Sequence, residues 1–289
     1  MTAGADTRWT FSAIGTAWEI QTATPLPAAI RESVRDLIDA FDRDWSRFRE
    51  DSLVTTLARG GGAVPTPPDA AAMLDAYAEL SAATAGAVNP LVGDALAGRG
   101  YDPGYGFIDH GARPAPGDWT SRLEWSGGRL GLSSPAMIDV GALGKGRLVD
   151  RVLAEIAPWV DGRVVVDASG DLAVRGGPER VGLEHPYDPR RAIGVWEVTD
   201  AALCASATNR RAWGDGLHHV LDARTGQPVR TVAATWALAA DAMTADAVAT
   251  ALFFEGGPEL AHRWGVHWVR MTTDGRVEWS PDCKAELFT

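Results

Sequence analysis

Residues 138–152 have the sequence IDVGALGKGRLVDRV, in which a short apolar strand is followed by an acid, a glycine-rich turn, a lysine and a helix. Glycine lets the backbone approach a ligand closely, and the positive end of a helix attracts phosphate. The segment is not a Walker A loop, because that motif needs Ser or Thr where Gly146 stands. Two interpretations remain open: a phosphate or nucleotide site, or a glycine-rich turn with a surface lysine.

A second segment, MTADAVATALFF (243–254), combines a carboxylate and a hydroxyl among apolar residues. Asp246 and Thr250 are four residues apart, so on a helix they share one face. Such a pair of hard oxygen ligands suits Mg²⁺, which takes few ligands from the protein and phosphate oxygens for the rest. Alternatively, Asp246 is an exposed acid near a helix start and Thr250 bonds back to a carbonyl.

A third segment, HHVLDARTG (218–226), contains two adjacent histidines. On a strand, His218 and His219 point to opposite faces and are therefore poor joint zinc ligands. We expect one to face the interior or a cleft, where it could act as a base, and the other to be exposed. Either histidine could equally be a satisfied polar residue without a catalytic role.

A fourth segment, DASGD (167–171), is a turn of small residues after a predicted strand. It would allow close approach of a planar or phosphate ligand, but such turns occur in many folds.

Helical and strand patterns are mixed along the chain without regular βαβ alternation, which predicts an α+β fold with mixed sheets and packed helices. The long stretch 89–135 is rich in Gly and Pro, and loops of that length are usually functional. The predicted helices are 27–48, 67–84, 144–157 and 243–254, and residues 59–62 are a predicted flexible break. The predicted strands are 8–22 with a break at Gly15, 122–125, 128–132, 163–166, 172–174, 194–199, 203–206, 217–221, 231–238, 267–272 and 276–279.

The composition is that of a globular protein of 289 residues, with 46% apolar and 22% charged residues. This length predicts one large domain or two intimate ones. With 27 basic and 38 acidic residues the net charge is −11, which argues against nucleic acid or an anionic membrane as a general partner. Two cysteines are too few for a disulfide framework or a structural zinc site.

No secretion signal is evident, because Asp6 and Arg8 interrupt the N-terminal segment before an apolar region can form. The most apolar long stretch, 231–254, contains Asp241 and Asp246 and is not a membrane span. A cytoplasmic location is therefore expected.

Taken in order, the motifs resemble the ApbE family, the Mg-dependent FAD:protein FMN transferases, over roughly residues 12 to 256. The segments that carry the resemblance are IGT (14–16), SRFREDSLVTTL (46–57), AGAVNPLVGDAL (85–96), IDVGALGKGRLVDRV (138–152), VVDASGDLAV (165–174), VGLEHP (181–186), SATNR (206–210), HHVLDARTGQPV (218–229) and MTADAVATALFF (243–254). The resemblance implies an ApbE-like, T-fold-related architecture, with residues 1–289 forming one flavin transferase domain or two intimate subdomains.

The resemblance also implies an activity: transfer of FMN from FAD to a Ser or Thr hydroxyl of an acceptor protein, with release of AMP. FAD pyrophosphatase activity and FAD binding without turnover remain as alternatives. The implied partners are FAD, Mg²⁺ and a cytoplasmic or cytoplasm-facing acceptor, without nucleic acid or membrane insertion.

The same resemblance assigns roles to individual residues. The implied Mg²⁺ ligands are Asp246, Thr250 and the backbone carbonyl of Ala142. The implied catalytic residues are His219, Lys145 and Asp222, and the implied FAD contacts are Ile14, Phe48, Ala87, Val88, Asn89, Asp139, Lys145 and Val220. The chain departs from the family pattern at Asn89, Ser169, Thr208 and Ala223, where Asp, Gly, Asp and Pro respectively are usual.

Overall fold

The computed structural model describes residues 7–288, so Asp6, which entered the expectation about secretion, lies outside the described residues. Its centre is a nine-stranded sheet in which each neighbouring pair is antiparallel. The order is β1 (Thr7–Ala13), β2 (Thr16–Thr22), β6 (Val164–Asp167), β7 (Asp171–Glu184), β8 (Ala192–Ala207), β13 (Val232–Ala239), β14 (His267–Thr272) and β15 (Val277–Trp279), with β16 (Glu286–Leu287) paired to β8.

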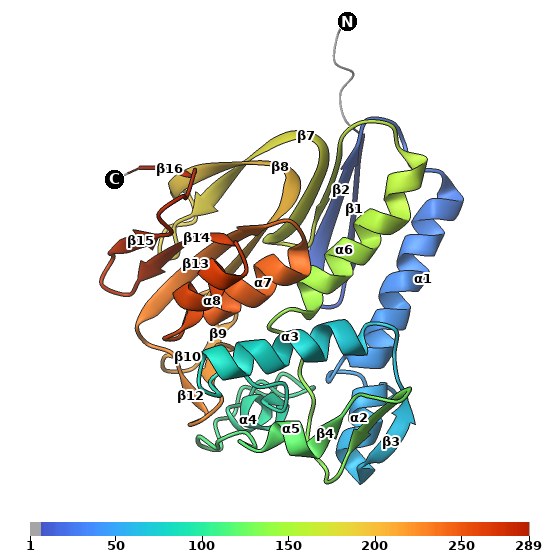
Figure 1. The fold of residues 1–289 in the computed structure, drawn as a ribbon, viewed down its shortest axis with the longest axis vertical. Coiled ribbons are helices and arrows are strands. Elements are labelled where there is room, and N and C mark those ends of the chain that lie inside the picture. Colours follow the sequence, from blue (N-terminus) through green and yellow to red (C-terminus); the bar gives the residue numbers. More distant parts are fainter. Residues whose placement is uncertain (1–6, 289) are drawn as a thin grey trace, which may run out of the picture.

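Helices cover one face of this sheet (Figure 1). They are α1 (Ala28–Trp45), α6 (Gly144–Ile156), α7 (Ala242–Ala251) and α8 (Gly257–Arg263). The apolar stripe of α1 is the one that the sequence predicts, with Ile30, Val34, Ile38, Phe41 and Trp45 buried. The predicted α+β class is confirmed.

The segment predicted to be loop-rich folds with its neighbours into a second layer below the helices (Figure 1). This layer contains α2 (Leu53–Gly60), α3 (Ala70–Ala83), α4 (Gly93–Gly98), α5 (Trp119–Arg122) and a three-stranded sheet of β3 (Gly62–Pro65), β5 (Arg129–Leu132) and β4 (Leu123–Glu124). The remaining elements are the short helix η1 (Ala157–Trp159) and two ribbons, β9 (Ala212–Trp213) with β10 (Leu217–His218) and β11 (Leu221–Asp222) with β12 (Gln227–Pro228).

Three predicted element boundaries are wrong for identifiable reasons. The strands predicted at 172–174, 194–199 and 203–206 belong to the longer β7 and β8, because a register shift between Val174 and Pro178 absorbs the Gly-Gly-Pro interruption. Residues 59–60 end helix α2, whose start is capped by the Ser52 hydroxyl, so they are not a flexible break. The predicted strand 217–221 is divided between β10 and β11.

Helices α6 and α7 touch at Gly146, where a Cβ atom would lie 2.2 Å from the carbonyl oxygen of Ala242. The Asp150 carboxylate of α6 accepts hydrogen bonds from the backbone N–H groups of Ala242 (2.7 Å) and Met243 (2.9 Å) at the start of α7. Asp246 of α7 in turn accepts one from the Gly146 N–H, at 2.9 Å. Because no side chain stands between the backbones, the two helices are fixed relative to each other.

We predict that Gly146→Ala lowers the free energy of unfolding by about 1–3 kcal/mol, because the added methyl group has no room between α6 and α7. Gly60→Ala is the matched control, since nothing lies within 4 Å of its added methyl. That control is expected to be neutral or stabilising by up to about 1 kcal/mol. Urea denaturation measures both variants, and equal stability of the two would contradict the close contact.

Candidate active site

A cavity of about 630 Å³ lies where the helices that cover the large sheet meet the second layer. This volume is within the usual range of small-molecule sites. Its walls come from the β1–β2 turn, the segments after α1 and α3, the start of α6, the end of β8, the segment after β10, and α7. The fold thus collects residues from most of the chain around one space.

Twelve of the residues that the sequence assigns to a site line this cavity. They are Ile14, Phe48, Ala87, Val88, Asn89, Asp139, Ala142, Lys145, His219, Val220, Asp246 and Thr250.

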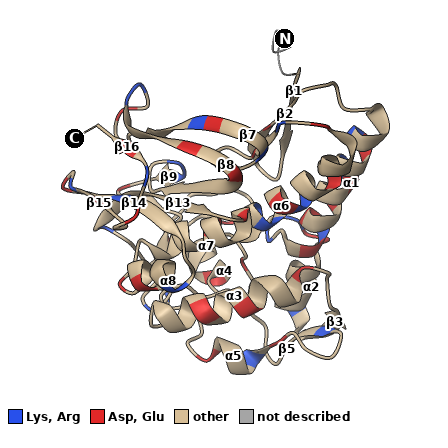
Figure 2. Ribbon diagram, turned by 45° about the horizontal axis from the view of Figure 1, so that its top comes forward, with Lys and Arg blue, Asp and Glu red and all other residues tan. Residues whose placement is uncertain are grey.

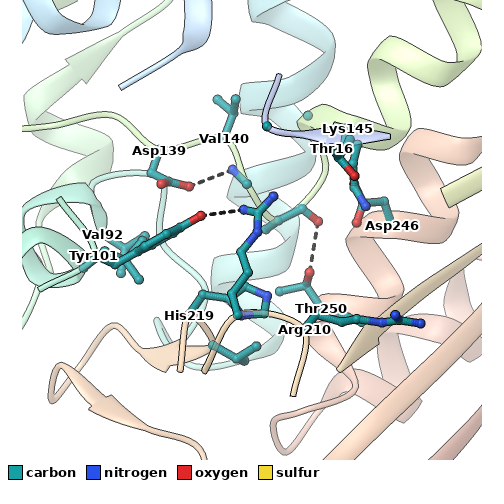
Figure 3. Close-up of a pocket in the computed structure, with 18 of the residues that line it drawn as sticks. Thr16, Val92, Tyr101, Asp139, Val140, Lys145, Arg210, His219, Asp246 and Thr250 are labelled. Atoms are coloured by element: carbon teal, nitrogen blue, oxygen red, sulfur yellow. Dashed lines mark hydrogen bonds between the residues drawn. The ribbon is translucent and has the colours of Figure 1, made fainter. Parts of the chain in front are cut away.

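Three oxygen-bearing groups come together at one edge of the cavity (Figure 3). The Thr250 hydroxyl donates to the Ala142 carbonyl at 3.2 Å, and Asp246 lies one helical turn before Thr250 on α7. Asp246 is 5% exposed, and one of its carboxylate oxygens accepts a hydrogen bond from the Gly146 N–H. The alternative of Asp246 as an exposed acid at a helix start is therefore wrong.

The backbone loop that carries the Ala142 carbonyl is held by a buried tyrosine from α3. The Tyr77 hydroxyl donates to the Asp139 carbonyl at 3.0 Å and accepts from the Ala142 N–H at 3.3 Å. Burial raises the pKa of Tyr77 well above its ordinary value, so this hydroxyl stays protonated and keeps its donor. The sequence contains no signal that marks Tyr77 for this position.

Charged groups are concentrated next to the oxygen cluster. Lys145 Nζ lies 2.6 Å from Asp171 Oδ2, in the turn that sequence analysis treated as a weak candidate. Burial lowers the pKa of Lys145, but the carboxylates of Asp171 and Asp246 outweigh that effect and raise it. Burial and the Asp171 charge raise the pKa of Asp246 well above its ordinary value. The site therefore holds two carboxylates for one ammonium group.

His219 borders the cavity opposite these charges (Figure 3), and its Nδ1 has no hydrogen-bond partner among residues 7–288. Burial, the nearby Arg211 guanidinium and His218 lower the pKa of His219 to about 3, so the imidazole is neutral at pH 7. A neutral imidazole can accept a proton.

His218 is also buried, at 7% exposure, and its Nε2 lies 2.8 Å from the Val229 carbonyl oxygen. The expectation that one of the two histidines is exposed is therefore wrong. Val229, which follows β12 directly, thus contacts the His218 ring through its carbonyl oxygen.

Asp222 does not line the cavity. Its carboxylate pairs with Arg224 at 2.6 Å and accepts the Arg224 backbone N–H at 2.9 Å. Its carbonyl accepts the Gly226 N–H at 2.7 Å, which closes the turn 222–226. The neighbouring Ala223 N–H donates to the Ala87 carbonyl, so the turn supports the cavity wall from outside. Asp222 therefore stabilises the turn beside the cavity and does not line the cavity itself.

The residues that depart from the family pattern have defined contacts. The Asn89 side chain donates to the Pro116 carbonyl at 2.8 Å and accepts the Leu91 N–H at 2.8 Å. An ionised aspartate could accept the Leu91 N–H but could not donate to the Pro116 carbonyl. Ser169 has φ +58°, a conformation that favours glycine, and its hydroxyl donates to the Ala17 carbonyl. Both positions therefore keep their loops in place at the cavity.

Arg47 is a site residue that the sequence did not single out, although it precedes the predicted Phe48. It is 3% exposed, donates to Asp139 Oδ2 at 2.6 Å and to the Tyr101 carbonyl at 2.7 Å, and lies over the Phe48 ring at 4.1 Å from its centroid. The Tyr105 ring stacks on the Phe48 ring, with the two ring centroids 5.3 Å apart. Together these side chains form an apolar wall held by one buried ion pair.

The residues at the oxygen cluster fit a small divalent cation. No group of three or more His, Cys, Asp or Glu side chains suited to a metal occurs within residues 7–288. The cluster instead combines one carboxylate with a hydroxyl and a carbonyl, a set of hard oxygen atoms that leaves positions for phosphate oxygens. Among the helices of the described part of the chain, none has the length and apolar character to cross a membrane.

A sequence profile described as the ApbE family matches residues 14–267. The chain belongs to the ApbE family. The FAD:protein FMN transferase of Rhodobacter capsulatus is 28% identical over 313 aligned residues, which include 98% of this chain and 58% of that protein. The chain thus spans less than two thirds of the length of this relative.

Two further proteins extend the ApbE comparison. The FAD:protein FMN transferase of Treponema pallidum (strain Nichols) is 26% identical over 283 residues, covering 84% of this chain and 77% of that protein. The crystal structure of the ApbE protein of Thermotoga maritima superposes with a TM-score of 0.82 at 23% identity, covering 96% of this chain and 97% of the other. The predicted family and its fold are confirmed.

We predict that the His219 ring of the ligand-free protein stays neutral as the pH falls from 8 to about 4. An NMR titration of the ring protons measures this, and a midpoint near the ordinary value of about 6.5 would contradict the enclosure of the ring. Unfolded His219 takes up a proton near pH 6.5 and the folded ring near pH 3. Native stability is therefore lost as the pH falls between these values. His219→Gln is expected to make that loss smaller.

Proposed function

We propose that this chain is an Mg²⁺-dependent FAD:protein FMN transferase that attaches FMN to a Ser or Thr hydroxyl of an acceptor protein and releases AMP. The observation that supports it best is the oxygen cluster of Ala142, Asp246 and Thr250 beside Lys145, with His219 across the same cavity. The two relatives named FAD:protein FMN transferase favour the transfer of FMN from FAD to a protein.

Binding of an anion by a chain of net charge −11 requires local cations. Acidic residues lie on outer helices such as α3, which carries Asp75 and Glu79 and no basic residue (Figure 2). At the cavity, by contrast, Lys145, Arg210 and Arg211 line the space; Arg210 pairs with Glu184 and Arg211 donates to the Tyr101 hydroxyl. Bound Mg²⁺ would neutralise further charge on the diphosphate and polarise its phosphorus–oxygen bonds.

In the reaction, the acceptor hydroxyl oxygen forms a bond to the phosphorus of the FMN half of FAD, and the bond from that phosphorus to the AMP oxygen breaks. His219 accepts the proton of the hydroxyl group. Lys145 stabilises the negative charge that accumulates on the phosphate oxygens. The charge of the bound diphosphate would raise the pKa of His219 above its value in the free protein, which makes the ring a better proton acceptor.

Apolar groups hold the rings of FAD in this proposal. Phe48, Ile14 and Val88 line the cavity and offer surfaces for stacking and packing. Arg47 and Asp139 keep that wall in place through their 2.6 Å ion pair.

The test is AMP release from FAD by the purified protein, with and without Mg²⁺ and with and without a flavin-acceptor domain. AMP that forms only with both, together with an acceptor mass increase of one FMN, supports the transferase. AMP without an acceptor identifies a pyrophosphatase instead. Tight FAD binding without AMP under any condition identifies a binding protein and contradicts both reactions.

We predict that Asp246→Asn reduces metal-dependent AMP release by at least about 100-fold while the protein stays folded. The amide keeps the shape of the carboxylate and can still accept the Gly146 N–H, but it lacks the charge that a divalent ion needs. Asp241→Asn on the same helix is the control, because asparagine also caps helices well. Equal activity of the two variants in the AMP assay would exclude Asp246 as a metal ligand.

We predict that His219→Ala lowers kcat by roughly 10²- to 10⁴-fold, the usual contribution of a general base, and changes the Kd for FAD by less than about threefold. His218→Gln is the comparison, since His218 contacts Val229 outside the cavity and is expected to keep kcat. Single-turnover kinetics and FAD titration separate the two constants. Equal losses in kcat and FAD affinity in His219→Ala would make His219 a binding residue.

A further inference from the structure

Asp171 is a buried carboxylate that the proposed chemistry does not use. It is 0% exposed and begins β7 directly after the turn 167–170. Lys145 Nζ is 2.6 Å from its Oδ2, and no other described group donates a hydrogen bond to either carboxylate oxygen. A buried carboxylate without hydrogen-bond donors is costly unless a cation compensates it, and here that cation is Lys145.

The two partners differ in their access to the cavity. The Lys145 side chain is 26% exposed and lines the cavity, whereas Asp171 lies behind it on a central strand. The Asp171 carbonyl accepts the Ala168 N–H at 2.9 Å, and the adjacent Gly170 carbonyl accepts the Ala205 N–H of β8 at 2.8 Å, so the backbone that carries the carboxylate is held in place. Asp171 therefore holds the ammonium group from behind and leaves its remaining N–H bonds free for the cavity.

Lys145 has a second possible partner. The residue after it, Gly146, donates its N–H to Asp246 Oδ2, and Figure 3 shows the Lys145 and Asp246 side chains at the same edge of the cavity. Without Asp171, the ammonium group would be attracted to Asp246, because opposite charges at short range in a buried site interact strongly. An ammonium group paired with Asp246 would compete with a divalent cation for that carboxylate.

We propose that Asp171 is a positioning residue that keeps Lys145 away from Asp246, so that the carboxylate is free for the divalent cation and the ammonium group for the phosphate of the substrate. This inference rests on the metal site of the proposed function. It assigns a role to Asp171 and explains why a second carboxylate lies beside Lys145.

Removing the charge of Asp171 and removing that of Lys145 are expected to change the metal affinity in opposite directions. Removing the Asp171 charge deletes a negative charge near the metal site. It also frees the Lys145 ammonium group to pair with the Asp246 carboxylate. Both effects lower the affinity for a divalent cation. Removing the Lys145 charge deletes the competitor, so the affinity rises. Removing both leaves the net charge of the pair unchanged, and the affinity returns towards that of the wild type.

The test uses the full chain, freed of metal, and Mn²⁺ alone as a probe of the hard oxygen site, with the EPR signal of free Mn²⁺ as the readout. We expect Asp171→Asn to weaken Mn²⁺ binding by about tenfold or more, and Lys145→Met to tighten it several-fold. The double variant is expected to bind within about threefold of the wild type. Near-UV circular dichroism establishes that each variant is folded.

Asp167→Asn is the matched control. Asp167 lies in the same turn, and its Oδ1 accepts the Gly170 N–H at 3.1 Å, which an asparagine can also do. It makes no ion pair with Lys145, so its variant is expected to change Mn²⁺ affinity by less than about threefold. Equal weakening by Asp167→Asn and Asp171→Asn would overturn the specific role of Asp171.

Two further outcomes separate the inference from the proposed function. If the wild type binds Mn²⁺ and Asp171→Asn binds it equally well, the positioning role is wrong while the metal site stands. If the wild type binds no Mn²⁺, the metal site is wrong and the role of Asp171 falls with it. Should Asp171→Asn fail to fold, Lys145→Met and the double variant still decide the question. A double variant that binds Mn²⁺ about tenfold or more weakly than the wild type would overturn the inference, because Asp171 would then act without Lys145.

Discussion

The contact between α6 and α7 at Gly146 is the constraint on which the rest of the site depends. A backbone N–H of one helix bonds to the Asp246 carboxylate of the other at 2.9 Å, at a point where no Cβ fits. Lys145 precedes this point by one residue, and Thr250 follows Asp246 by one helical turn. The same helix crossing therefore sets the positions of the ammonium group, the carboxylate and the hydroxyl. The Asp150 carboxylate stabilises this crossing, because it accepts hydrogen bonds from two backbone N–H groups at the start of α7.

This geometry concentrates charge where the interior would otherwise exclude it. Asp171 and Asp246 are both buried, and Lys145 supplies one positive charge beside these two carboxylates. Such a group is unfavourable in isolation, and a divalent cation bound beside the two carboxylates would offset their excess negative charge. Stability and ligand binding are thus linked at the same residues, since the buried negative charge is a cost that a bound cation removes.

The sequence predicts the local parts of this arrangement well and the long-range parts poorly. The stripe of α1 and the helix that begins at Gly144 are set by nearby residues, and both are found in the structure. The short apolar strand expected directly before that helix is not formed, because residues 133–143 are turn and coil between β5 and α6. Tyr77 and Arg47 act through partners 62 and 92 residues away, so no local pattern marks them. His218 likewise contacts the Val229 carbonyl, 11 residues further along the chain, which no local strand pattern indicates.

The most direct test of the account is the position of a metal in crystals grown with Mn²⁺ and FAD. The account predicts an anomalous peak within coordination distance of Asp246, Thr250 and the Ala142 carbonyl, with the FAD diphosphate on the open side of the ion and Lys145 beside it. A diphosphate bound elsewhere in the cavity, or an ion away from these three oxygens, would contradict it.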